Sequence, residues 1–393
     1  MYISILGRQP ALSIAELERV YTNVTWASET TALIDTEELI DIQRLGGSQK
    51  IGKVVAMLPV GDWRKASLKI VQHYSKAWET YEGKITLGIS AYEFDVDTRD
   101  IQKTGIILKG KLKTTTASLR LIPNQEAILS TATSHHNKLG LSDNKVELIV
   151  VRGQKNIIIA ESIGAQNITA LAARDQGRPK RDAFVGMLPP KLAQIMINLA
   201  GPLTADPTSD LAQPRVLDPF CGTGVILQEA SLLGYGVYGT DLSEKMIRFS
   251  RDNLNWLEEQ YHSTGHWYLH EGDAMDTKWQ QPIAAVVAES YLGQPFSAPP
   301  SSAKLTEVRG NCNHIISAFL KNLALQIASG TPVVVAIPAW KDSYGMFTHL
   351  PLVSKLESLG YSQAQFQTVN TEQLLYYRPD QVVAREILVL IKN

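Results

Sequence analysis

Residues 215–234 read RVLDPFCGTGVILQEASLLG, and this stretch decides the fold of the second half of the chain. Its first three residues predict a short buried strand, and a helix with regularly spaced apolar positions is expected to begin near Val225. Between them, Gly222 and Gly224 let the backbone approach a ligand where a side chain would block it. A strand, a glycine turn and a helix in this order indicate a Rossmann-like domain with a cofactor at the turn.

Acidic residues follow three successive predicted strands. Asp218 ends the first strand and offers a carboxylate that suits a cationic cofactor, and Asp241 comes about 23 residues later, where a carboxylate can bind a ribose diol. Asp273 follows the third strand, and with the backbone of Ala274 it could hold an adenine amine. Each carboxylate alone could be a helix cap or a solvated loop residue, but the ordered set favours a cofactor site.

The glycine pattern distinguishes between two kinds of cofactor chemistry. A nicotinamide enzyme favours the spacing GxGxxG, whereas Leu227 stands at the position of the third glycine. The sequence therefore favours methyl transfer over hydride transfer. We interpret Cys221, inside the same turn, as a small packed residue rather than as a covalent nucleophile.

The whole chain has the composition of a globular protein with two or three domains. It has 393 residues, of which 44% are hydrophobic and 20% charged, and its net charge of −1 neither favours nor excludes a nucleic-acid partner. The longest apolar runs are too short for a membrane span, and the first 20 residues lack the pattern of a secretory signal. Two cysteines suit a reducing compartment, so we expect a cytoplasmic protein without a membrane or a metal site.

The alternation of strand and helix patterns suggests four segments. We predict an N-terminal α/β unit at 1–60, an α+β module at 61–165, a linker rich in Arg, Lys, Gly and Pro at 166–190, and the Rossmann-like domain at 191–393.

Several segments resemble the THUMP-containing tRNA guanine-N2 methyltransferases of the guanosine-10 type. The similarity lies in ILGRQPALSIAELE, SLRLIPNQEAILSTATSHHNKLG, RDAFVGMLPPKLAQIMINLA, DPFCGTG and LLYYRPDQVVAREILVL, which together span most of the chain. The resemblance implies an α/β fold with a C-terminal class I methyltransferase domain. It also implies an N-terminal ferredoxin-like plus THUMP region that binds tRNA.

The same resemblance implies S-adenosylmethionine as cofactor and assigns residues to it. Asp218, Cys221, Gly222 and Gly224 would surround its methionine part, Asp241 its ribose and Asp273 its adenine. The full set of expected cofactor residues is Asp218, Phe220, Cys221, Gly222, Gly224, Asp241, Leu242, Asp273, Ala274 and Glu289.

The catalytic loop departs from the family pattern. Methylation of an exocyclic amine needs acceptors that orient the amine and an aromatic ring that stacks on the base, and the family uses a DPPY-like loop after the fourth strand for this. Here the loop is ESYLGQPF, in which Glu289 aligns with the acidic position while Ser290 and Tyr291 replace the two prolines. One interpretation makes Glu289 and Tyr291 the catalytic residues, with Phe296 as another ring that could stack; the other is that amine methylation is lost.

Two basic clusters are candidates for tRNA contacts, although each could equally be a solvated face. They supply the expected RNA-binding residues Lys109, Lys111, Lys113, Arg178, Lys180 and Arg181.

The leading hypothesis is an S-adenosylmethionine-dependent tRNA methyltransferase that acts on the 2-amino group of a guanosine, alone, as a homo-oligomer or with an auxiliary subunit. Two alternatives stay open: a catalytically impaired RNA-binding homologue, and an amino-methyltransferase that acts on DNA.

Overall fold

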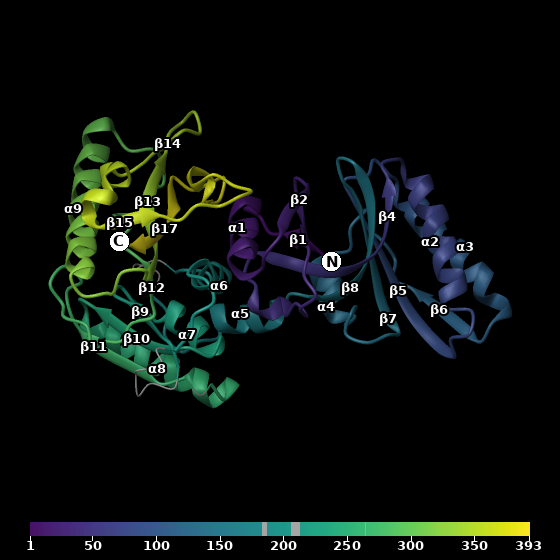
Figure 1. The fold of residues 1–393 in the computed structure, drawn as a ribbon, viewed down its shortest axis with the longest axis horizontal. Coiled ribbons are helices and arrows are strands. Elements are labelled where there is room, and N and C mark those ends of the chain that lie inside the picture. Colours follow the sequence, from purple (N-terminus) through teal and green to yellow (C-terminus); the bar gives the residue numbers. More distant parts are fainter. Residues whose placement is uncertain (183–186, 206–212, 264) are drawn as a thin grey trace. The chain divides into compact units, whose positions relative to one another are not determined.

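The structure is a computed structural model of residues 1–393, and it describes all of them except 183–186, 206–212 and 264. Two compact units are present: the first holds residues 1–17, 21–43 and 47–170, and the second holds 18–20, 44–46 and 171–393. Each unit is built on its own sheet (Figure 1). Within the described ranges, no helix combines the length and the apolar character that a membrane crossing requires.

The first unit contains an eight-stranded sheet in the order β2-β3-β1-β4-β8-β7-β5-β6. Strand β5 runs parallel to β6 and β7, and the other neighbours are antiparallel. The strands are β1 (Tyr2–Leu6), β2 (Val24–Ser28), β3 (Thr31–Ile34), β4 (Ser48–Pro59), β5 (Gly83–Tyr92), β6 (Ala117–Leu121), β7 (Lys145–Arg152) and β8 (Asn156–Ala165). The helices that begin in this part of the chain are α1 (Pro10–Val20), α2 (Trp63–Ala77), α3 (Thr98–Lys111), α4 (Thr131–His136) and α5 (Ile168–Gln176).

Helices α2 and α3 cover one face of this sheet. Trp63, Ile70 and Tyr74 of α2 and Ile101 and Leu108 of α3 pack in one buried cluster with apolar residues of β5–β8. Both helices have an aspartate at the N-cap, whose carboxylate accepts a backbone N–H of the first turn.

The segments predicted at 1–60 and 61–165 both contribute strands to this one sheet, with β4 beside β8. Their division into a ferredoxin-like unit and a THUMP-like module, and the boundaries at 60, 165 and 190, stay predictions. The predicted linker contains helix α5, and its residues 183–186 lie outside the described residues.

The second unit contains a mostly parallel sheet in the order β11-β10-β9-β12-β13-β17-β15. Strands β9–β13 are parallel, while β17 runs antiparallel between β13 and β15. The strands are β9 (Arg215–Asp218), β10 (Gly236–Asp241), β11 (Trp267–Glu271), β12 (Ala285–Glu289), β13 (Pro332–Lys341), β14 (Phe347–Thr348), β15 (Tyr361–Gln363), β16 (Leu375–Tyr376) and β17 (Val383–Lys392). The helices are α6 (Pro190–Leu199), α7 (Val225–Leu232), α8 (Glu244–Tyr261) and α9 (Ser302–Ala324). This arrangement confirms the predicted Rossmann-like domain.

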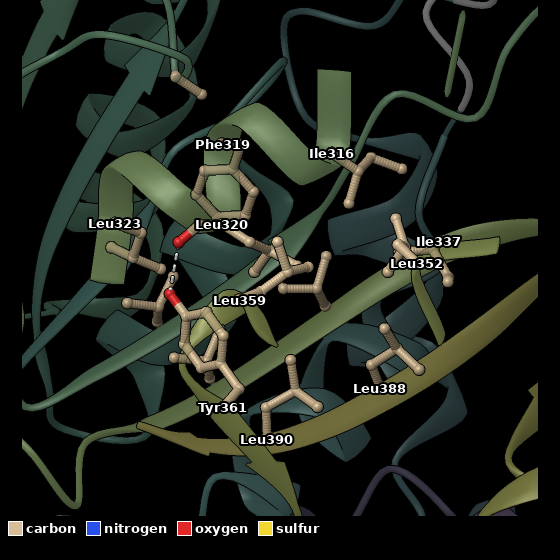
Figure 2. Packing of buried hydrophobic residues seen from close by; sticks show 14 of the residues in the cluster. Ile316, Phe319, Leu320, Leu323, Ile337, Leu352, Leu359, Tyr361, Leu388 and Leu390 are labelled. Atoms are coloured by element: carbon tan, nitrogen blue, oxygen red, sulfur yellow. Dashed lines mark hydrogen bonds between the residues drawn. The ribbon is translucent and has the colours of Figure 1, made fainter. Parts of the chain in front are cut away.

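A continuous apolar core fixes helix α9 to this sheet (Figure 2). Figure 2 shows Phe319, Leu320 and Leu323 of α9 facing Leu388 and Leu390 of β17. The Tyr361 hydroxyl donates a 2.8 Å hydrogen bond to the Leu320 carbonyl, so its polar tip is satisfied inside the core. This face of the sheet is therefore filled, and the strand ends are left to form a site.

Candidate active site

A cavity of 520 Å³ lies in the second unit, where strands β9, β10 and β12 end. The order of the sheet reverses between β9 and β12, and a parallel sheet opens a crevice for ligands at such a point. All the residues predicted to bind the cofactor line this cavity except Gly224, and so does Tyr291. The structure thus brings the predicted site together, while the individual roles stay predictions.

The glycine turn adopts a backbone that explains its composition. Gly222 has φ +50° and Gly224 has φ +82°, and both values lie in the left-handed region that favours glycine. Gly224 is the N-cap of α7. The Ser250 hydroxyl of α8 donates a 2.9 Å hydrogen bond to the Gly222 carbonyl and holds the turn against the next helix.

Asp218 is a buried carboxylate without a cationic partner in the described part of the chain. It is 2% exposed, and its Oδ1 accepts a 3.1 Å hydrogen bond from the Phe220 N–H. Burial, together with the nearby charges of Asp241 and Glu289, raises the pKa of Asp218 well above its ordinary value. A positively charged ligand in the cavity would relieve this unfavourable charge.

Asp241 joins the glycine turn to the end of β10. Its Oδ2 accepts from the Gly222 N–H and its Oδ1 from the Ser243 N–H, each at 2.9 Å. Burial raises the pKa of Asp241, and the two hydrogen bonds offset part of this rise. Asp273 is arranged similarly beyond β11, where its Oδ1 accepts from the Met275 N–H at 2.9 Å, next to the buried Ala274.

The thiol of Cys221 is 5% exposed, and Ser250 Oγ lies 3.6 Å from its sulfur. Burial, with Asp218 and Asp241 nearby, raises the pKa of this thiol well above its ordinary value. The thiolate needed for nucleophilic attack is therefore disfavoured, in line with the interpretation of Cys221 as a packed residue.

The loop after β12 is fixed at its first two residues. Glu289 pairs with Arg385 of β17, a contact that the sequence analysis missed. Ser290 is buried, and both its N–H (3.0 Å) and its hydroxyl (2.8 Å) donate to the Ala336 carbonyl of β13. Ser290 stands where the family pattern has a proline, and its hydrogen bonds restrain the backbone there. The next residue, Tyr291, is 43% exposed and lines the cavity.

Comparisons with known proteins agree with this geometry. Residues 178–311 match the family described as RMKL-like, methyltransferase domain. Over its whole length, the chain is similar in structure to TrmN from Thermus thermophilus, with a TM-score of 0.52, 15% identity and coverage of 99% of that chain. The second unit has the class I methyltransferase fold.

Curated relatives are similar to parts of this chain. One is a tRNA (guanine(10)-N2)-dimethyltransferase from Methanothermobacter thermautotrophicus, 30% identical over 43% of this chain and 44% of its own. Another with the same name, from Methanocaldococcus jannaschii, is 42% identical over 25% of this chain and 27% of its own. The matches therefore span less than half the length of these relatives. They confirm the resemblance to the tRNA guanine-N2 methyltransferase family.

The basic residues predicted to contact RNA differ in exposure. Lys109, Lys111 and Lys113 are exposed around the end of α3. Near the start of the matched methyltransferase segment, Arg181 is exposed, and Lys180 is half-buried with its Nζ 3.5 Å from Asp252.

Arg178 differs from its predicted neighbours Lys180 and Arg181 because it is buried, with 3% of its surface exposed. The structure thus places this guanidinium away from solvent, and its contact with RNA stays a prediction. The sequence shows only that Arg178 is close to other basic residues, and this spacing carries no information about burial.

Among the described residues, no group of three or more histidine, cysteine or acidic side chains is arranged to hold a metal ion.

Proposed function

We propose that this protein is an S-adenosylmethionine-dependent tRNA methyltransferase that acts on the exocyclic 2-amino group of a guanosine. The observation that carries the proposal is the set of four carboxylates, Asp218, Asp241, Asp273 and Glu289, around one cavity at the ends of adjacent strands. The curated names of the relatives supply the substrate class.

The residues present fit this cofactor by the chemistry of their donors and acceptors. Asp218 offers a buried negative charge near the glycine turn, which suits the cationic methionine end. Asp241 would bind the ribose diol, and Asp273 with the Ala274 backbone would bind the adenine. When bound, S-adenosylmethionine supplies an electrophilic methyl group.

The chain must then hold a weak nucleophile in line with that methyl group. The lone pair of the guanine 2-amino group is delocalised into the base, so orientation and hydrogen-bond acceptors determine the rate. Glu289 would accept a hydrogen bond from the amine and take up the proton that the nitrogen loses as its new bond to carbon forms. Tyr291, exposed at the cavity, would stack on a base flipped out of the RNA.

The proposal is tested by incubating the purified protein with methyl-labelled S-adenosylmethionine and either unmodified tRNA or duplex DNA. We expect label in tRNA alone, and loss of that label in Glu289→Gln, which keeps the shape of the side chain but removes its charge. Transfer to DNA would favour the alternative of a DNA amino-methyltransferase. Binding of cofactor and tRNA without transfer would favour the impaired RNA-binding homologue.

A further inference from the structure

The ion pair between Glu289 and Arg385 crosses one strand of the sheet. Glu289 ends β12 and lies opposite Ala336 of β13, while Arg385 of β17 lies opposite Pro338 of the same strand. Positions two apart on a strand share a face, so both charged side chains lie on the same face, with Ala336 and Pro338 between them. The small side chain of Ala336 leaves a path for the guanidinium.

This contact is selective for one oxygen of the carboxylate. Arg385 Nε donates to Glu289 Oε1, and the described residues provide no other hydrogen bond to this carboxylate. An ionised carboxylate has about four lone-pair sites, so acceptor capacity is left on both oxygens. The two side chains are 12% and 16% exposed, which limits their screening by solvent. Glu289 lines the cavity and Arg385 does not, so the arginine supports the carboxylate from behind.

The charges around Glu289 make this support necessary. Asp218 from β9 is close enough for the two carboxylates to interact, and Asp241 from β10 adds a further negative charge near Asp218. Strand β13 contributes Ala336 and Pro338 at this level and no charge. Arg385 is thus the cation that contacts Glu289 among the described residues, and it balances the charge of this carboxylate beside Asp218.

We infer that Arg385 is a positioning residue that orients Glu289, so that its carboxylate accepts from the two adjacent N–H groups on the Watson–Crick edge of guanine. Guanine presents the N1–H and the 2-amino group side by side, and a carboxylate with free lone pairs matches both. A carboxylate that rotates away from this edge would lose the match. The inference rests on the proposed function and deepens it.

The test measures kcat and KM for tRNA methylation, together with the dissociation constant of S-adenosylmethionine. Its variants are Arg385→Gln, Arg385→Lys and, as a matched control, Arg251→Gln on the exposed surface of α8. In Arg385→Gln we expect kcat to fall by about 10- to 100-fold, as the loss of a hydrogen bond to a charged group would produce, while the KM for tRNA stays within about twofold. Cofactor affinity should stay within about twofold of the unaltered protein.

Arg385→Lys separates charge from geometry. It should recover part of kcat because it keeps the charge, but not all of it because lysine lacks the planar guanidinium. Arg251→Gln should leave kcat and KM unchanged.

Three outcomes would overturn the inference: an unchanged kcat in Arg385→Gln, a cofactor affinity that falls in parallel with kcat, or no recovery of kcat in Arg385→Lys. A lack of methylation by the unaltered protein would instead contradict the proposed function itself.

Discussion

Substitution of Gly224 by alanine tests the glycine turn most sharply. An added Cβ would lie 2.9 Å from Ser250 Oγ and 3.3 Å from Ser250 Cα, and Ser250 cannot move away without breaking its hydrogen bond to Gly222. The left-handed backbone costs an alanine about 1 kcal/mol, and a lost hydrogen bond costs about 1 kcal/mol more. With the steric contact, we expect Gly224→Ala to lower the free energy of unfolding by about 2–3 kcal/mol.

Gly234→Ala is the matched control for backbone strain. Gly234 has φ +90°, but an added Cβ there meets no atom within 4 Å, so only the strain of about 1 kcal/mol remains. For a domain of this size about 1 kcal/mol corresponds to about 3 °C, so thermal melting should show losses of about 6–9 °C for Gly224→Ala and about 3 °C for Gly234→Ala. Calorimetry should show S-adenosylmethionine binding weakened at least about tenfold in Gly224→Ala alone. Equal melting temperatures and equal affinities in the two variants would refute this account of the turn.

Three further predictions concern charge, the loop and the RNA surface. The pKa of Asp218 is raised in the folded state, so ionisation of its carboxylate lowers the stability of the folded protein. This cost is absent below the ordinary pKa and grows as the pH rises toward the pKa of the folded state. Asp218→Asn should therefore raise the melting temperature of the ligand-free protein more at pH 8 than at pH 5, and it should weaken cofactor binding. A smaller rise in melting temperature at pH 8 than at pH 5 would contradict the charge assigned to Asp218. Ser290→Ala removes the 2.8 Å hydrogen bond to Ala336 and should lower kcat about fivefold without changing cofactor affinity, as measured by steady-state kinetics and calorimetry. Glutamine at all three of Lys109, Lys111 and Lys113 should reduce the slope of log affinity for tRNA against log salt concentration by up to about 2. Arginine at the same three positions should preserve the slope. An unchanged slope in the glutamine variant would show that these lysines do not contact the RNA.

The grouping of the predicted cofactor residues at one place could be inferred from the sequence because the pattern is encoded locally. A glycine turn and acidic strand ends depend on residues that are close in sequence, and parallel strands bring their carboxyl ends to one edge of a sheet. Asp218, Asp241 and Asp273 therefore line a single cavity, as the pattern indicates. Local signals also set the starts of helices: α2 begins at Trp63, where the side chain of Asp62 caps it.

The rest of the site depends on contacts between segments far apart in the sequence. Arg385 reaches Glu289 only because β17 lies antiparallel next to β13, and no residue spacing in the sequence indicates that pairing. The same limit applies to Ser290, whose partner Ala336 is on another strand, and to Arg178, whose burial depends on the packing around it.

The most direct test of the central claim is the identity of the methylated nucleoside. Unmodified tRNA is incubated with the protein and methyl-labelled S-adenosylmethionine, digested to nucleosides and analysed by mass spectrometry. We expect labelled N2-methylguanosine or its dimethylated form from the unaltered protein, and neither from Glu289→Gln. Label in a different nucleoside, or equal yields from the unaltered protein and the variant, would contradict it.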